Sequence, residues 1–151
     1  MQFTVAGFQN SNNNTPPTNP VNGMITWQAA SVGAPIQSFD SISLNLGGHN
    51  YTVNELGFYR FDVQGWDMIG GLVNDVGSVG NLTDDFWLRW NRNPLSGFDF
   101  VYASSQRSGI WDSLSPASFT SFSITAVPEP TMLSLLMVGL LGVGVRRCRH
   151  Q

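Results

Sequence analysis

Hydrophobic and polar side chains alternate along most of the first 126 residues, in short runs that glycine and asparagine separate. In residues 39–46, Ile42, Leu44 and Leu46 fall on one side of an extended chain, and serine and asparagine fall on the other. This two-residue period is typical of a β-strand with one buried face. The pattern predicts further strands within residues 1–8 and at residues 23–30, 57–63, 66–73, 86–92, 98–103 and 118–126.

Turn residues separate these strands. Gly47 and Gly48 interrupt the alternation, which resumes at Tyr51 and Val53, so we expect a hairpin around the two glycines. Residues 10–23 are rich in asparagine and proline, which predicts a surface loop.

The same pattern sets the expected fold class. No run of 11 or more residues before Thr131 has the 3.6-residue period of an amphipathic helix. Eight or nine short strands with frequent turns favour an all-β domain over residues 1–127, a β-sandwich or jelly roll with an aromatic core.

The last part of the chain has a different pattern. Residues 131–145 are uncharged and rich in leucine, valine and glycine, with Thr131 and Ser134 as the only polar residues. A helix from Thr131 to Val145 would be about 22 Å long, short for a hydrocarbon core of about 30 Å. A buried core helix is the alternative, but it would be amphipathic. We therefore predict a short transmembrane helix at 131–145.

Charged and proline residues flank this apolar segment. Before it stand Val127, Pro128, Glu129 and Pro130, and the two prolines hold the chain extended around one carboxylate. Basic residues follow the segment and would stay on the cytoplasmic side of a membrane. They are Arg146, Arg147 and Arg149.

This order of proline-flanked acid, apolar helix and basic stop resembles the PEP-CTERM sorting signal. The resemblance covers residues 127–149, with Pro128, Glu129 and Pro130 at the motif positions. It implies a Gram-negative bacterium that makes exopolysaccharide, and export of residues 1–127 ahead of a signal at 128–151. An inner-membrane exosortase would recognise and cleave the tail. The precursor would lie in the inner membrane and the product at the cell surface or in the extracellular biofilm matrix.

Proteins with such a signal normally begin with a secretory leader that has a basic start. Here residues 1–8 alternate like a strand, and no arginine or lysine occurs before Arg60. We therefore expect that a leader is missing ahead of Met1; the alternative is that the chain is a fragment that is never exported.

Charge and cysteine content exclude several classes of protein. The net charge is −3, only 11% of residues are charged, and the seven basic residues are all arginine. Such a chain has no basic patch for general nucleic-acid binding. Cys148 is the single cysteine, which excludes a disulfide framework and a cysteine-based zinc site within the chain.

Residues for catalysis or metal binding are few. His49 falls in a predicted turn and no G-x-S-x-G motif accompanies it, which argues against a serine triad. A glycosidase would need two facing carboxyl groups, and the aspartates in the middle of the chain keep that alternative open. Asp75, Asp84 and Asp85 are weak calcium candidates, although such residues also mark solvated turns.

The five tryptophans raise a third alternative. Trp87 and Trp90 have opposite parity within one predicted strand, so one of them should leave the core and could stack on a sugar. From sequence we expect a non-enzymatic exported protein without cofactor, metal or catalytic residue, recognised by exosortase. The alternatives are an exopolysaccharide-binding module that uses Trp87 and Trp90, or a small glycoside hydrolase.

Overall fold

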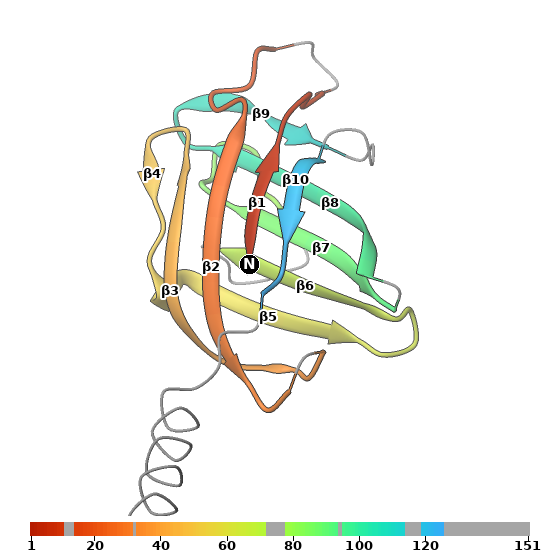
Figure 1. Ribbon diagram of the computed structural model, residues 1–151. Coiled ribbons are helices and arrows are strands. Elements are labelled where there is room, and N and C mark those ends of the chain that lie inside the picture. Colours follow the sequence, from red (N-terminus) through yellow and green to blue (C-terminus); the bar gives the residue numbers. More distant parts are fainter. Residues whose placement is uncertain (11–13, 32, 72–77, 94, 114–118, 126–151) are drawn as a thin grey trace, which may run out of the picture.

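The computed structural model describes residues 1–10, 14–31, 33–71, 78–93, 95–113 and 119–125. In these residues, ten strands form two five-stranded antiparallel sheets that lie one over the other. The strands of one sheet cross those of the other at a steep angle (Figure 1). The all-β prediction is confirmed, and the layers form a sandwich-like arrangement.

The first sheet has the strand order β10-β1-β2-β3-β4. Its strands are β1 Gln2–Val5, β2 Val21–Ala29, β3 Ile36–Leu46, β4 His49–Asn50 and β10 Phe119–Ser123. Only β10 returns to this sheet from the far end of the chain (Figure 1).

The second sheet has its strands in chain order, β5 to β9. They are β5 Leu56–Phe61, β6 Trp66–Gly71, β7 Phe86–Arg92, β8 Leu95–Ser104 and β9 Arg107–Asp112. Hairpins therefore build this sheet, and the interleaved Greek keys expected of a jelly roll are not formed by the described strands. The prediction for residues 86–92 is confirmed at both ends.

Two sequence predictions need correction. The strand expected to resume at Tyr51 and Val53 ends at Asn50, and a 3-10 helix, η1, spans Val53–Glu55. Glu55 turns the chain there, because its carboxylate accepts hydrogen bonds from the Thr52 amide at 2.5 Å and the Thr52 hydroxyl at 2.8 Å. Strand β9 was not predicted, since its first two residues are both exposed and break the alternation.

Predicted strand ends also shift slightly. Residues 72–73, 118 and 126 of the predicted strands lie outside the described residues. Ile124 and Thr125 are described, and they follow β10 without strand structure.

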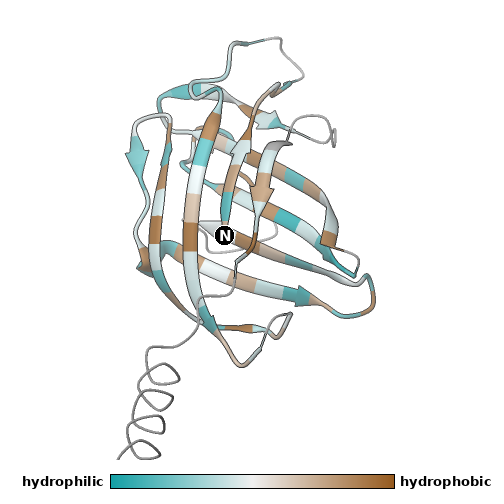
Figure 2. Ribbon diagram, in the orientation of Figure 1, coloured by the Kyte–Doolittle hydropathy of each residue, from teal (hydrophilic) through white to brown (hydrophobic). Residues whose placement is uncertain are grey.

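Aromatic rings fill the space between the sheets. Phe100 lies at the centre of this core, with its ring centroid 5.7 Å from those of Phe3 and Phe86 and 6.0 Å from that of Phe8. Along strands such as β1 and β3, hydrophobic positions alternate with polar ones (Figure 2), as expected for strands buried on one face. The predicted aromatic core is therefore present.

The loop after β1 closes one end of the core. The Tyr102 hydroxyl donates a hydrogen bond to the Thr18 carbonyl oxygen at 2.7 Å and accepts one from the Thr18 amide at 3.1 Å. The Trp111 indole N–H donates to the Asn14 carbonyl oxygen at 3.3 Å. The described part of the predicted surface loop is thus fastened to the second sheet.

Tyr102 should make the fold sensitive to high pH. Burial raises the pKa of the Tyr102 hydroxyl to about 12, above the ordinary value of 10.0. The unfolded chain then loses this proton first, so stability present below pH 10 is lost as the pH rises toward 12. We expect Tyr102 to account for about 1 kcal/mol of lost unfolding free energy between pH 9 and pH 11.

Chemical denaturation at both pH values measures this loss, with Tyr102→Phe as the comparison. The Phe variant should lose less stability over this range, because it has no hydroxyl to ionise. An equal loss in both proteins would contradict the assignment.

Candidate functional site

The residues of the predicted sorting signal lie outside the described part of the chain. This applies to the motif, the ends of the apolar segment and the basic stop: Val127, Pro128, Glu129, Pro130, Thr131, Val145, Arg146, Arg147 and Arg149. Among the described residues, no helix is long and apolar enough to cross a membrane. The transmembrane helix at 131–145 therefore remains a sequence prediction.

Strand β7 separates the two tryptophans that the sequence suggested for carbohydrate binding. Phe86, Leu88 and Trp90 point into the core, where Trp90 is 4% exposed. Trp87 and Arg89 have the opposite parity and lie on the outer face of the second sheet. Of the pair, Trp87 alone is placed where a ligand could reach it.

Trp87 belongs to a row of aromatic side chains on that outer face. We call Tyr59, Phe61, Trp66, Arg89 and Trp87 the aromatic strip. The rings of Tyr59 and Phe61 stack with centroids 6.4 Å apart, and those of Phe61 and Trp66 stack at 3.8 Å. The Arg89 guanidinium carbon lies 5.2 Å from the Trp66 ring centroid and 5.4 Å from that of Trp87. The strip is therefore continuous across β5, β6 and β7.

Strand register places these side chains on one face. Phe61 lies opposite Trp66 in the β5–β6 ladder, and Arg89 lies one strand further along, opposite Met68. Trp87 lies opposite Gly70, which itself lies opposite Gly57. These two glycines bring no side chain to the surface beside Trp87.

The strip is accessible and electrically neutral. Tyr59 is 41% exposed, and Phe61, Trp66 and Trp87 are half-buried. Arg89 brings one positive charge, and the Asp99 carboxylate accepts hydrogen bonds from its Nε, at 2.9 Å, and from its Nη2. An uncharged ligand thus meets no unpaired charge on the strip.

Sequence reasoning identified only Trp87 of these five residues. Alternation within one strand does not show which residues of other strands lie beside it. The sequence did contain a signal that could have brought Phe61 and Trp66 together. Residues 62–65 form a turn that ends in Gly65, at a φ of 72°, and this turn places Phe61 opposite Trp66 in the β5–β6 hairpin. A four-residue hairpin loop of that kind is common.

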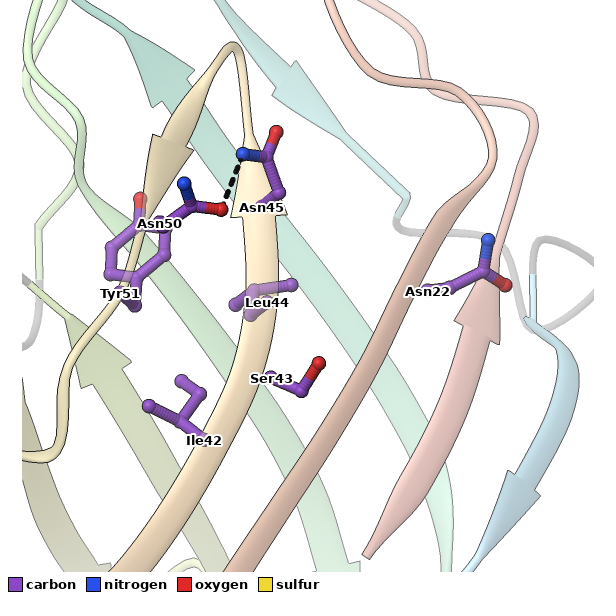
Figure 3. Close-up of a pocket in the computed structure, with 7 residues that line it drawn as sticks. All are labelled: Asn22, Ile42, Ser43, Leu44, Asn45, Asn50 and Tyr51. Carbon is purple, nitrogen blue, oxygen red and sulfur yellow. Dashed lines mark hydrogen bonds between the residues drawn. The ribbon is translucent and has the colours of Figure 1, made fainter.

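The first sheet has a different outer face. Apart from Met24, many of its side chains are hydroxyls and amides that bond to one another across the strands, as in Thr4 to Asn22 at 2.8 Å and Thr26 with Ser41 at 2.6 Å. A shallow pocket opens at this sheet where β4 leaves β3, and Asn45 donates to Asn50 at its rim, at 2.8 Å (Figure 3). Its lining is Asn22, Ile42, Ser43, Leu44, Asn45, Asn50 and Tyr51.

This pocket offers little for acid–base chemistry. Tyr51 is its titratable group, and burial raises the pKa of the Tyr51 hydroxyl above the ordinary range. That hydroxyl also donates to the Asp84 carbonyl oxygen at 2.5 Å. His49 lies nearby, with its Nε2 3.1 Å from a Glu55 carboxylate oxygen. These groups hold the turn after β4 in place.

The two described calcium candidates, Asp84 and Asp85, accept hydrogen bonds from backbone amides. The Asp84 carboxylate accepts from the Ser105 amide at 2.8 Å. The Asp85 carboxylate accepts from the Gly80 amide at 3.1 Å and from the Thr83 hydroxyl. Asp75 lies outside the described residues. Across the described ranges, no group of three or more His, Cys, Asp or Glu side chains is arranged to hold a metal ion.

Other carboxylates form an ion-pair cluster at one end of the sandwich. Asp67, with a side chain only 6% exposed, accepts from Arg60 Nε at 3.0 Å and Nη2 at 2.9 Å. Arg92 Nε lies 3.6 Å from Asp67, and Arg92 Nη1 donates to Asp62 at 3.0 Å. Arg60 also donates to the Gly33 carbonyl oxygen at 2.9 Å, which joins the two sheets.

Comparison with known families identifies the tail. Residues 126–149 match the family described as PEP-CTERM protein-sorting motif. The chain thus carries this sorting signal, which supports its place among the PEP-CTERM proteins that exosortases sort. The signal supports export and membrane-associated sorting. No curated protein and no solved structure matches the chain.

The ion-pair cluster predicts a stability difference between two aspartates. Asp67→Asn removes the charge between two arginines in a nearly dry position, so we expect a loss of about 2–3 kcal/mol of unfolding free energy. Asp62→Asn affects a carboxylate that is 79% exposed, and the loss should stay within about 0.5 kcal/mol. Urea denaturation measures both. Equal losses would show that the cluster does not depend on the buried charge.

Proposed function

We propose that this protein is a non-enzymatic β-domain that its C-terminal signal delivers to the cell surface or the extracellular matrix. The PEP-CTERM match at residues 126–149 carries the proposal. The export and exosortase recognition that the signal supports explain why a neutral, hydroxyl-rich domain stands beside an apolar, arginine-ended tail.

The order of residues in the tail explains how sorting would proceed. Pro128 and Pro130 keep the chain around Glu129 extended, so an enzyme at the membrane surface can bind it as an extended peptide. Residues 131–145 would insert in the inner membrane as a short helix, and Arg146, Arg147 and Arg149 would hold its far end at the cytoplasmic headgroups. Cleavage near the motif then separates the β-domain from its membrane segment.

The non-enzymatic part is supported by how the described carboxylates are used. Asp67 and Asp99 are paired with arginines, and Asp85 accepts from a backbone amide and a hydroxyl. A glycoside hydrolase needs two carboxyl groups free to act across a sugar. Nothing among the described residues favours that alternative.

Carbohydrate binding is the second candidate function. It is favoured by the position of Trp66 and Trp87 on one outer face, with Arg89 between them. This role is compatible with the first, since sorting needs only the tail.

The sorting proposal is tested by Glu129→Gln, expressed behind a secretory leader in a Gram-negative host that makes exopolysaccharide and an exosortase. Without the carboxylate, enzyme recognition should fall roughly tenfold or more, the scale of one lost charge-assisted hydrogen bond. Full-length precursor should then accumulate in the membrane fraction. Cell fractionation and intact mass of the product measure the change.

Asp40→Asn is the matched control, because it neutralises an exposed carboxylate on the β-domain. It should leave sorting unchanged. Normal processing of the Glu129→Gln protein, or processing of the wild type in a host without its exosortase, would contradict the proposal.

A further inference from the structure

We propose that the aromatic strip is a binding site for a neutral, β-1,4-linked polysaccharide chain. The strip consists of Tyr59, Phe61, Trp66, Arg89 and Trp87, on the outer face of the second sheet. The proposal rests on the proposed function only for the place where such a chain would be met, and the binding itself does not require sorting.

The strip is not needed to fill the core. The space between the sheets has its own aromatic residues, with Phe3, Phe100 and Trp111 all nearly inaccessible. The outer face of the first sheet is largely polar, with Thr4, Thr26 and Ser41 among its side chains. A solvent-facing antiparallel sheet is usually polar in this way. The outer face of the second sheet departs from this pattern, because Met68 and Val101 lie on the same face as the strip and are also apolar and nearly inaccessible.

Charge selects the class of ligand. Asp99 neutralises Arg89, so the strip has no unpaired cation to attract phosphate or other acidic groups. A neutral sugar chain suits this surface, because its axial C–H groups stack on aromatic faces and its hydroxyls bond at the edges. Arginine has five N–H donors, and the bonds to Asp99 come from Nε and Nη2. The Arg89 guanidinium and the Tyr59 hydroxyl are polar groups of the kind that bond to sugar hydroxyls.

Geometry favours an extended chain over a compact ligand. The strip crosses three neighbouring strands, β5, β6 and β7, which lie about 4.8 Å apart. That spacing is close to the length of one sugar in a β-1,4-linked chain. Such chains are flat ribbons with C–H groups on both faces, whereas α-1,4-linked chains coil away from a flat surface.

A second copy of this chain is the other occupant to consider. A stable protein interface normally uses about 20–30 residues on each side. The strip offers five side chains, of which Tyr59 is the most exposed. It is too small to hold a dimer by itself.

The test uses the full chain, purified in a detergent without a sugar headgroup. Cellohexaose, xylohexaose and mannohexaose are the probes, and maltohexaose is the α-linked comparison. Calorimetry and tryptophan fluorescence measure binding. We expect at least one β-linked probe to bind more tightly than maltohexaose, with affinity about tenfold weaker in Trp66→Ala and Trp87→Ala.

Two variants keep the result interpretable if a tryptophan variant misfolds. Tyr59→Ala removes an exposed ring from the strip, and binding should weaken about threefold with the far-UV circular dichroism spectrum unchanged. Met24→Ala is the matched control, because Met24 is 46% exposed on the outer face of the other sheet. It should bind like the wild type.

Several outcomes would overturn the proposal. These are no binding of any β-linked probe at millimolar concentration, equal binding of maltohexaose, or binding that Tyr59→Ala and Trp87→Ala leave unchanged. Self-association of the wild type that Trp87→Ala abolishes in sedimentation experiments would instead make the strip an interface between copies. Normal processing of the Glu129→Gln protein would contradict the sorting proposal and leave this test unaffected, so the two proposals fail separately.

Discussion

Packing of aromatic rings between the two sheets determines the rest of this structure. Phe100 contacts rings from both layers, including Phe3 and Phe86. A strand shows alternate residues to opposite faces, so an inward Phe86 requires that Trp87 face outward. The surface that a ligand can reach is therefore a consequence of the core. By the same alternation, the inward hydrophobic residues of the first sheet leave threonine, serine and asparagine on its outer face. These side chains bond to one another, and that face is largely hydrophilic.

The alternation of residues predicted most strands, because strands such as β1 and β7 are buried mainly on one face. It failed where local chemistry or polar content dominates. At Val53–Glu55, the carboxylate of Glu55 bonds to Thr52 and bends the chain into a 3-10 helix. In β9, exposed residues at the start hide the inward positions of Gly109 and Trp111. Assignment of strands to sheets depends on pairing between distant segments, such as β1 with β10, and no local pattern contains that information.

The two candidate sites differ in how far sequence could reveal them. A sorting signal acts as a linear peptide, so the order of Pro128, Glu129 and the apolar segment suffices to recognise it. The aromatic strip exists only after β5, β6 and β7 are aligned. Opposite parity showed that Trp87 and Trp90 must separate, and the inward Phe86 and Leu88 indicate which one is buried. The neighbours of Trp87 required the register of the sheet.

Covalent geometry links the β-domain closely to its signal. Strand β10 ends at Ser123, and Pro128 follows five residues later, a distance of at most about 18 Å for an extended chain. An enzyme that acts at the motif must therefore work close to the first sheet, where β10 is an edge strand. The aromatic strip lies on the outer face of the other sheet. Because the signal leaves from one layer and the strip faces outward from the other, a polysaccharide bound to the strip and an enzyme at the motif would occupy separate surfaces of one small domain.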